Sequence, residues 1–257
     1  MKQTIFITGA TSGIGKSTAY LFAQKGYNLI LTGRRDERLQ AIKADLETNF
    51  SCEVQTLSFD VRDKEEVAKA INQIDDNRFP TIDILVNNAG LASGLTKIDQ
   101  GEFSDWDVMI DTNVKGLLYV SRTLMPKLKN QASAHIINIG STAGKNVYQN
   151  GNVYCATKHA VDALSQSMRI ELLPYGIKVT SINPGACETE FSEVRFKGDK
   201  ERAKKVYQDF DPLTPADVAD AILYCASLPK HVCINDLTLT CLTQANANYN
   251  IKKSELK

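Results

Sequence analysis

The sequence of 257 residues predicts an α/β protein with a Rossmann-type, doubly wound parallel sheet of about seven strands and helices on both faces. Short runs rich in β-branched residues alternate with amphipathic stretches, which is typical of parallel strands joined by crossover helices. No internal repeat or flexible linker divides the chain. The length alone is compatible with one or two domains, and this continuity favours a single domain over residues 1–257.

The strands of this sheet are expected where four to seven apolar or β-branched residues stand together. These segments are residues 4–8, 28–32, 54–60, 82–87, 136–141, 178–183 and 237–241.

Helices are expected between the strands. After the second and third strands, apolar residues recur at helical spacing, as the crossover helices of a parallel sheet require. Residues 104–130 and 153–173 are longer helical stretches, and Pro174 and Gly176 end the second.

Another helix start is indicated at Thr214, where a capping hydroxyl is followed by Pro215 at the first helical position and by Asp217 in the first turn. The segment before it, residues 190–211, carries too many charges to be buried. We therefore expect it to form a flap over the site.

Composition excludes several classes of protein. The 30 basic and 30 acidic residues balance, so a nucleic-acid partner is not expected. Six cysteines and three histidines form no cluster with metal-ligand spacing, so we expect no metal, and free thiols fit a reducing compartment. No leader pattern and no bilayer-length apolar run is found, so we expect a cytoplasmic protein without a membrane partner.

A glycine-rich turn follows the first predicted strand and leads into an amphipathic stretch. Glycines at this position let the backbone approach a pyrophosphate, and a helix N-terminus supplies amide donors to its oxygens. The spacing GxxxGxG departs from the generic GxGxxG fingerprint, but the position after the first strand favours a dinucleotide site. Its predicted cofactor-binding residues are Gly9, Thr11, Ser12, Gly13, Ile14 and Gly15.

The end of the second strand indicates which dinucleotide binds. Arg34 and Arg35 stand where an acid would grip the ribose 2′-hydroxyl of NAD. Planar guanidinium groups suit a phosphate dianion, so NADP is the predicted cofactor. The alternative is that both arginines are only the solvated start of a helix.

Two further strand ends carry candidate cofactor contacts. Asp60, beside Val61, is expected to accept a hydrogen bond from the adenine amino group. In the sequence NNAG, Asn87, Ala89 and Gly90 are expected near the ribose and the nicotinamide, although this motif also suits a plain structural turn.

A proton-transfer set is predicted from three residues. Tyr154 and Lys158 lie four apart and share one face of a predicted helix, and Ser141 ends the preceding strand. A tyrosine with an ordinary pKa of about 10 needs roughly 4 kcal/mol to titrate near neutrality. A cation about 4 Å away supplies roughly that much.

Six separated motifs together resemble the short-chain dehydrogenase/reductase family. They are TGATSGIG, NNAG, Asn113 within MIDTNVKG, Ser141 within INIGSTAG, YCATK from Tyr154 to Lys158, and Asn183-Pro184-Gly185.

The resemblance implies a role for each matching residue. Tyr154 would be the general acid and base, Ser141 would hold the substrate oxygen, and Lys158 would bind the nicotinamide ribose and lower the tyrosine pKa. Asn113 would support a water in a proton relay. Contacts to the nicotinamide end would come from Pro184, Gly185 and Thr189. Relatives pair the helices corresponding to 104–130 and 153–173, which implies a homo-oligomer, namely a homotetramer.

Finer motifs resemble the NADP-dependent branch of this family that oxidises serine, allo-threonine and related 3-hydroxy acids such as 3-hydroxypropionate, or reduces semialdehydes such as malonic semialdehyde. They are GRRDERL, NVYCATK, TEFSEVRFKGD and LTPADVADAI.

This branch implies a substrate carboxylate, and a carboxylate needs a cation. Within the predicted flap, Arg195 is the candidate, the alternative being a surface ion pair with Glu190 or Glu193. Two other functions stay open: a reductase of another carbonyl class such as 3-oxoacyl substrates, and a non-catalytic protein that senses NADPH.

Overall fold

The computed structural model describes residues 2–131 and 133–256 and contains a seven-stranded sheet in which every neighbouring pair of strands is parallel. The strand order is β3-β2-β1-β4-β5-β6-β7, which confirms the predicted doubly wound sheet. The order reverses between β1 and β4, and ligands of such sheets bind outside the carboxyl ends of the strands at this switch point. The strands are β1 (Thr4–Ile7), β2 (Asn28–Gly33), β3 (Val54–Ser58), β4 (Ile84–Asn87), β5 (His135–Ile139), β6 (Lys178–Pro184) and β7 (Asp236–Leu239).

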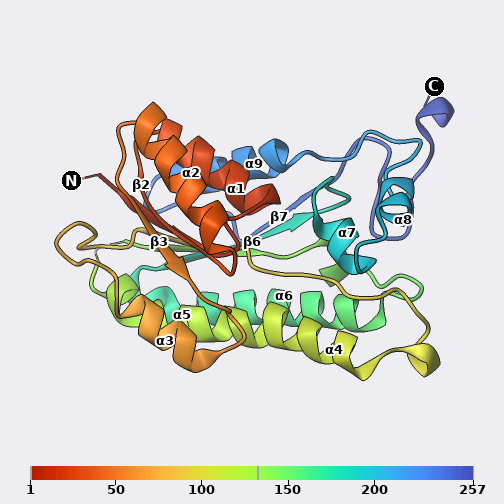
Figure 1. Ribbon diagram of the computed structural model, residues 1–257, viewed down its shortest axis with the longest axis horizontal. Coiled ribbons are helices and arrows are strands. Elements are labelled where there is room, and N and C mark those ends of the chain that lie inside the picture. Colours follow the sequence, from red (N-terminus) through yellow and green to blue (C-terminus); the bar gives the residue numbers. More distant parts are fainter. Residues whose placement is uncertain (1, 132, 257) are drawn as a thin grey trace.

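Helices cover both faces of the sheet (Figure 1). On one face lie α1, α2 and α9, and on the other lie α3, α4, α5 and α6, while α7 and α8 stand beyond the carboxyl end of the sheet. The helices are α1 (Gly13–Gln24), α2 (Asp36–Asn49), α3 (Lys64–Ile71), α4 (Phe103–Ile110), α5 (Leu117–Lys129), α6 (Asn152–Leu172), α7 (Phe191–Arg195), α8 (Lys200–Lys205) and α9 (Pro215–Ser227).

The central strand β1 explains why the sheet has two cores. Its side chains alternate between the faces, so Ile5 and Ile7 pack with α1, α2 and α9, whereas Phe6 packs with α3 and α5. In the sheet register, Phe6 lies between Ile30 of β2 and Leu85 of β4. Because both faces are covered, β1 and β4 are buried along their whole length, and β2 is buried except at its two ends.

One predicted helix is interrupted in the structure. The expected helix over residues 104–130 is divided into α4 and α5 by the π-helical turn η2 (Asp111–Gly116). The apolar spacing continues across this turn, so periodicity alone could not predict it. Such π turns inside helices are frequent at functional sites, and this one carries Asn113.

The charged segment 190–211, predicted to be a flap, forms the short helices α7 and α8 next to the carboxyl end of the sheet (Figure 1). The C-terminal segment holds its far end. The Lys253 amide donates to the Asp209 carbonyl at 2.7 Å, and the Lys253 ammonium pairs with Asp211 at 2.7 Å. The flap is therefore tied down by residues that follow the last strand.

Within residues 2–131 and 133–256, no helix combines the length and the apolar character that crossing a membrane would require.

Candidate active site

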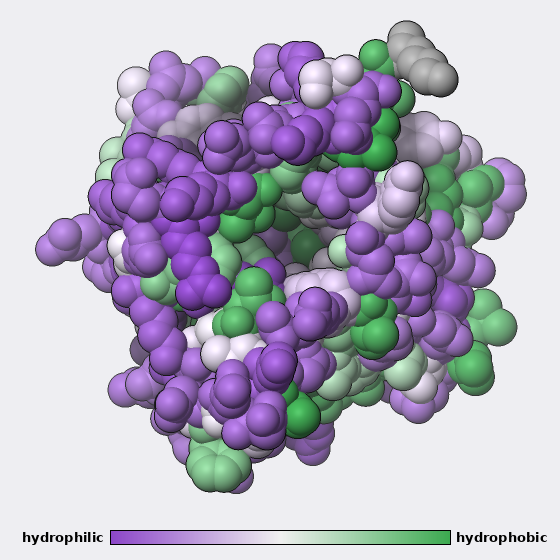
Figure 2. All heavy atoms as spheres, turned by 90° about the vertical axis from the view of Figure 1, so that its right-hand side faces the viewer, coloured by the Kyte–Doolittle hydropathy of each residue, from purple (hydrophilic) through white to green (hydrophobic). Residues whose placement is uncertain are grey.

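A cavity of about 540 Å³ opens at the carboxyl ends of the strands, within the size range of small-molecule sites. Figure 2 looks into this end of the molecule and shows a hollow with hydrophobic side chains inside and a largely hydrophilic rim. Most of the predicted site residues line it: Gly9, Thr11, Ser12, Gly13, Ile14, Arg34, Arg35, Asp60, Val61, Ala89, Gly90, Ser141, Tyr154, Lys158, Pro184, Gly185, Thr189 and Arg195.

The glycine turn forms a close backbone cradle ahead of α1. Gly9 and Gly13 adopt φ values of +66° and +52°, which favour glycine. A Cβ on Gly15 would lie 2.4 Å from the Gly9 carbonyl oxygen, and one on Gly13 would lie 3.2 Å from the Thr189 methyl. The glycines thus leave the backbone at the start of α1 without side chains. A pyrophosphate could therefore bind close to the helix N-terminus.

On the arginine side of the cavity, a carboxylate pairs with two guanidinium groups and offsets part of their charge. The Arg35 guanidinium donates to the Thr11 hydroxyl at 2.7 Å and pairs with Glu190 at 2.8 Å. Arg38, which the sequence analysis missed, pairs with the same carboxylate at 2.7 Å. Burial alone would raise the pKa of Glu190, but the hydrogen bonds and charges of the two arginines outweigh it and lower this pKa to about 2.

Asp60 is held at the mouth of the cavity by basic side chains. Arg62 donates to its carboxylate at 2.6 Å, and Arg34 lies 3.8 Å from it. Burial would raise the pKa of Asp60, but Arg62 and then Arg34 lower it below its ordinary value. Arg34 is thus drawn toward Asp60, whereas Arg35 lies over the glycine cradle.

Ser141, Tyr154 and Lys158 come together on the opposite side of the cavity. Ser141 follows β5, and its hydroxyl accepts from the Ala143 amide at 3.1 Å. The Lys158 ammonium donates to the Ile139 carbonyl at 2.8 Å and lies 6.0 Å from the centre of the Tyr154 ring. Tyr154 and Lys158 share one face of α6 and are almost fully buried.

Burial dominates the ionisation of this set. It raises the pKa of Tyr154 above the ordinary value, and the neighbouring Tyr148 adds to the increase, while the Ser141 hydrogen bond and the Arg195 charge lower it. Burial lowers the pKa of Lys158 to about 8. Among the protein groups, burial therefore outweighs the effects that lower the pKa of Tyr154, whereas the family resemblance implied a lowered pKa.

Two predicted cofactor residues lie outside the cavity lining. The Asn87 side chain is buried and donates at 2.9 Å to both Ser121 and Asn138, so it holds the strands and helices together. Its neighbour Asn88 lines the cavity instead and donates to the Gly9 carbonyl at 3.1 Å. Gly15, which lies against the Gly9 carbonyl, also does not line the cavity.

Asn113 likewise lies behind the cavity wall. Its amide oxygen accepts from the Leu91 amide at 2.9 Å, and its nitrogen donates to the Leu91 carbonyl at 2.8 Å and to Thr157 at 3.0 Å. Through these bonds the π turn fixes the backbone of the connection between β4 and α4 just after Gly90. Gly90 itself lies next to the Lys158 ammonium. In this structure the Asn113 side chain is fully engaged with protein groups.

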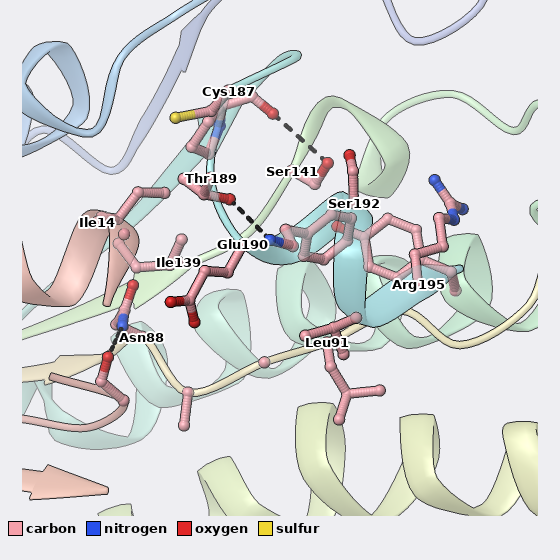
Figure 3. A pocket seen from close by; sticks show the side chains of 18 of the residues that line it. Ile14, Asn88, Leu91, Ile139, Ser141, Cys187, Thr189, Glu190, Ser192 and Arg195 are labelled. Carbon is pink, nitrogen blue, oxygen red and sulfur yellow. Dashed lines mark hydrogen bonds between the residues drawn. The ribbon is translucent and has the colours of Figure 1, made fainter. Parts of the chain in front are cut away.

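Arg195 occupies the other end of the cavity from Ile14 and Asn88 (Figure 3). Its guanidinium carbon lies 5.3 Å from the ring centre of Tyr154, 5.5 Å from that of Tyr148 and 5.9 Å from that of Phe191. Among the described residues it forms no ion pair, and its Nε is buried without a hydrogen-bond partner. Glu190, one of the expected surface partners, pairs with Arg35 and Arg38 instead.

Several lining residues were not predicted. They include Asn88, Leu91, Tyr148 and Gln244, which lie in connections that show no periodicity, and Phe191, the first residue of α7.

No group of three or more histidine, cysteine or acidic side chains in the described part of the chain is arranged to hold a metal ion.

The chain belongs to the short-chain dehydrogenase family: residues 3–200 match the family described as short chain dehydrogenase. It is 43% identical over 251 residues to the NADP-dependent 3-hydroxy acid dehydrogenase YdfG of Salmonella typhi, covering 97% of this chain and 99% of the relative. It is also 43% identical to the serine 3-dehydrogenase of Rhizobium radiobacter, covering 98% of each. These similarities confirm the family resemblance.

A solved structure described as the closed form of serine dehydrogenase complexed with NADP⁺ is similar to this one with a TM-score of 0.90 and 42% identity. The match covers 98% of this chain and 100% of the other.

Proposed function

We propose that this protein is an NADP-dependent oxidoreductase that moves a hydride between the nicotinamide and the β-carbon hydroxyl of short 3-hydroxy acids. The class of substrate comprises serine, allo-threonine and 3-hydroxypropionate, or malonic semialdehyde in the reverse direction. The observation that carries the proposal is Arg195: its guanidinium, which pairs with no anion among the described residues, lies beside the Tyr154 ring in the cavity that Ser141 also lines. The names of the two relatives support it.

The residues around Tyr154 suit proton transfer from a secondary or primary alcohol. Tyr154 removes the hydroxyl proton as general base, and Ser141 holds the same oxygen. Lys158 binds the ribose, and its charge together with that of Arg195 favours the tyrosinate. NADP, when bound, supplies the positively charged ring that accepts the hydride. Asn113 fixes the Leu91 backbone next to this set.

The arginines beside the cradle support the choice of NADP over NAD. Arg35 and Arg38 converge on one carboxylate, so an anion fits between their two guanidinium groups. We propose that the 2′-phosphate takes this place, with Arg34 at its edge. Residues 190–211 then act as the flap over the bound ligands.

The assembly and compartment are also proposals. Exposed apolar side chains on α4, α5 and α6, namely Ile110, Leu118 and Ile170, support pairing of these helices in a homotetramer. The six free cysteines support a cytoplasmic location. Light scattering behind size-exclusion chromatography measures the assembly.

The initial rate of nicotinamide reduction tests the function. L-serine, L-allo-threonine, 3-hydroxypropionate and a plain secondary alcohol are each offered with NADP and then with NAD. We expect turnover of the hydroxy acids with NADP only. Activity confined to the plain alcohol would exclude acid substrates.

Tyr154→Phe keeps the ring and removes only the hydroxyl that exchanges the proton. We expect kcat to fall by about 10² or more while NADPH binding, followed by fluorescence, is retained. Turnover near the wild-type rate would refute the acid–base role of Tyr154.

A further inference from the structure

Tyr148 lies in the loop before α6 and lines the cavity beside Arg195. Its ring is held by close packing, because a Cβ added to Gly151 would lie only 2.2 Å from a ring carbon. The ring also packs against the small core cluster that contains Tyr154 and Met109. The position of the Tyr148 hydroxyl is therefore fixed by its surroundings.

This hydroxyl accepts a hydrogen bond from Arg195, whose Nη2 donates to it. Burial raises the pKa of Tyr148, so the phenol is uncharged at neutral pH. A neutral acceptor orients a guanidinium without cancelling its charge, whereas a carboxylate would do both. Arg195 is thus oriented but not neutralised, and its buried Nε has no partner among the described residues.

The Arg195 backbone is fixed as well. Its carbonyl accepts from the Gly94 amide at 3.0 Å, which attaches the end of α7 to the segment after β4. Two residues further on, Lys197 pairs with the largely buried Asp105 at 3.0 Å. The guanidinium can therefore move only by rotation about the bonds of its own side chain, and the hydrogen bond to the Tyr148 hydroxyl restricts that rotation.

We propose that Tyr148 is a positioning residue: it holds the Arg195 guanidinium so that its free donors meet the substrate carboxylate, and it thereby sets the preference for hydroxy acids over neutral alcohols. This inference rests on the proposed function, since it requires Arg195 to bind a carboxylate. If the Arg195 side chain were flexible, part of the free energy of binding the carboxylate would be lost in ordering that side chain.

The test compares 3-hydroxypropionate with its methyl ester, which differ in the negative charge. Tyr148→Phe removes only the hydroxyl. We expect kcat/KM for the acid to fall about tenfold, mainly through KM, which corresponds to about 1.4 kcal/mol. The value for the ester should change less than about twofold, because the ester carries no charge for the guanidinium to bind. Binding of NADPH, followed by fluorescence, is expected to stay unchanged.

Tyr207→Phe is the matched control. Tyr207 also lines the cavity and its hydroxyl bonds to Ser192 at 2.8 Å and to the Cys187 carbonyl at 2.9 Å, but not to Arg195. This variant should keep the wild-type ratio of acid to ester activity. An equal loss of the ratio in both variants would overturn the positioning role, as would an unchanged ratio in Tyr148→Phe.

Arg195→Met separates this inference from the proposed function. If Arg195→Met leaves the acid-to-ester ratio unchanged, the carboxylate site itself is wrong and the inference fails with it. If Arg195→Met abolishes the preference and Tyr148→Phe does not, only the positioning role is overturned.

Discussion

Replacing Lys158 by methionine should reveal how much folding energy the cofactor-free protein loses by burying this ammonium. Burial lowers the pKa of Lys158 from 10.5 to about 8. At about pH 7 the charged form therefore costs about 3 kcal/mol, at 1.36 kcal/mol for each pKa unit. Methionine has a similar volume and carries no charge, so the variant Lys158→Met escapes this cost.

A second effect opposes the first. The Lys158 ammonium donates to the Ile139 carbonyl at 2.8 Å, and losing this bond leaves a buried acceptor unpaired. Such a loss costs about 1–3 kcal/mol. Near neutral pH the variant should therefore be as stable as the wild type or more stable by up to about 2 kcal/mol.

The pH dependence isolates the charge. The folded pKa of Lys158 lies below the unfolded value, so between about 8 and 10.5 the unfolded chain binds the extra proton. Stability of the wild type then rises with pH across this window. From about pH 7 to about pH 9.5 the wild type should gain about 2 kcal/mol relative to Lys158→Met, whatever the lost hydrogen bond costs.

Urea unfolding of the cofactor-free wild type and variant at these two pH values measures the difference. Groups common to both proteins cancel in the comparison. A stability difference that stays constant with pH would refute the conclusion that Lys158 is buried with a depressed pKa.

Two further substitutions test the cofactor end and the scaffold. Glu190→Gln removes the carboxylate that pairs with Arg35 and Arg38, so NADPH should bind about two- to fivefold more tightly and NADH should change less. Fluorescence titration measures both affinities, and weaker NADPH binding would contradict this reasoning. Thr214→Ala breaks the capping box with Asp217 at the start of α9. The free energy of unfolding, measured with denaturant, should fall by about 1 kcal/mol, and the ratio of acid to ester activity should not change. An unchanged free energy of unfolding would argue against the cap.

The sheet could be predicted from the sequence because its strands are buried on both faces. A buried parallel strand must be apolar throughout, and residues such as Phe6 and Leu85 mark it without reference to distant contacts. The motif residues were equally visible, since the glycine cradle and the Tyr154–Lys158 pair each lie within one short stretch. Boundaries shifted by one or two residues where strands end in polar turns.

The π turn and the contacts of the flap could not be predicted in this way. The turn leaves the apolar spacing of the helix intact, so only the backbone contacts of Asn113 reveal it. The pairs Arg38–Glu190 and Tyr148–Arg195 join segments far apart in the chain, and no local pattern links their members.

Both ends of the cavity are proposed to bind an anion, and residues 190–211 contribute a different charged group at each end. At the cofactor end, the Glu190 carboxylate pairs with Arg35 and Arg38 and offsets part of their charge, so a phosphate must displace or compete with a protein carboxylate. At the substrate end, Arg195 has a neutral phenol as its partner, so a substrate carboxylate meets an uncompensated charge. Under these proposals, selection of the cofactor depends on an exchange of anions, whereas selection of the substrate depends on how firmly one guanidinium is oriented.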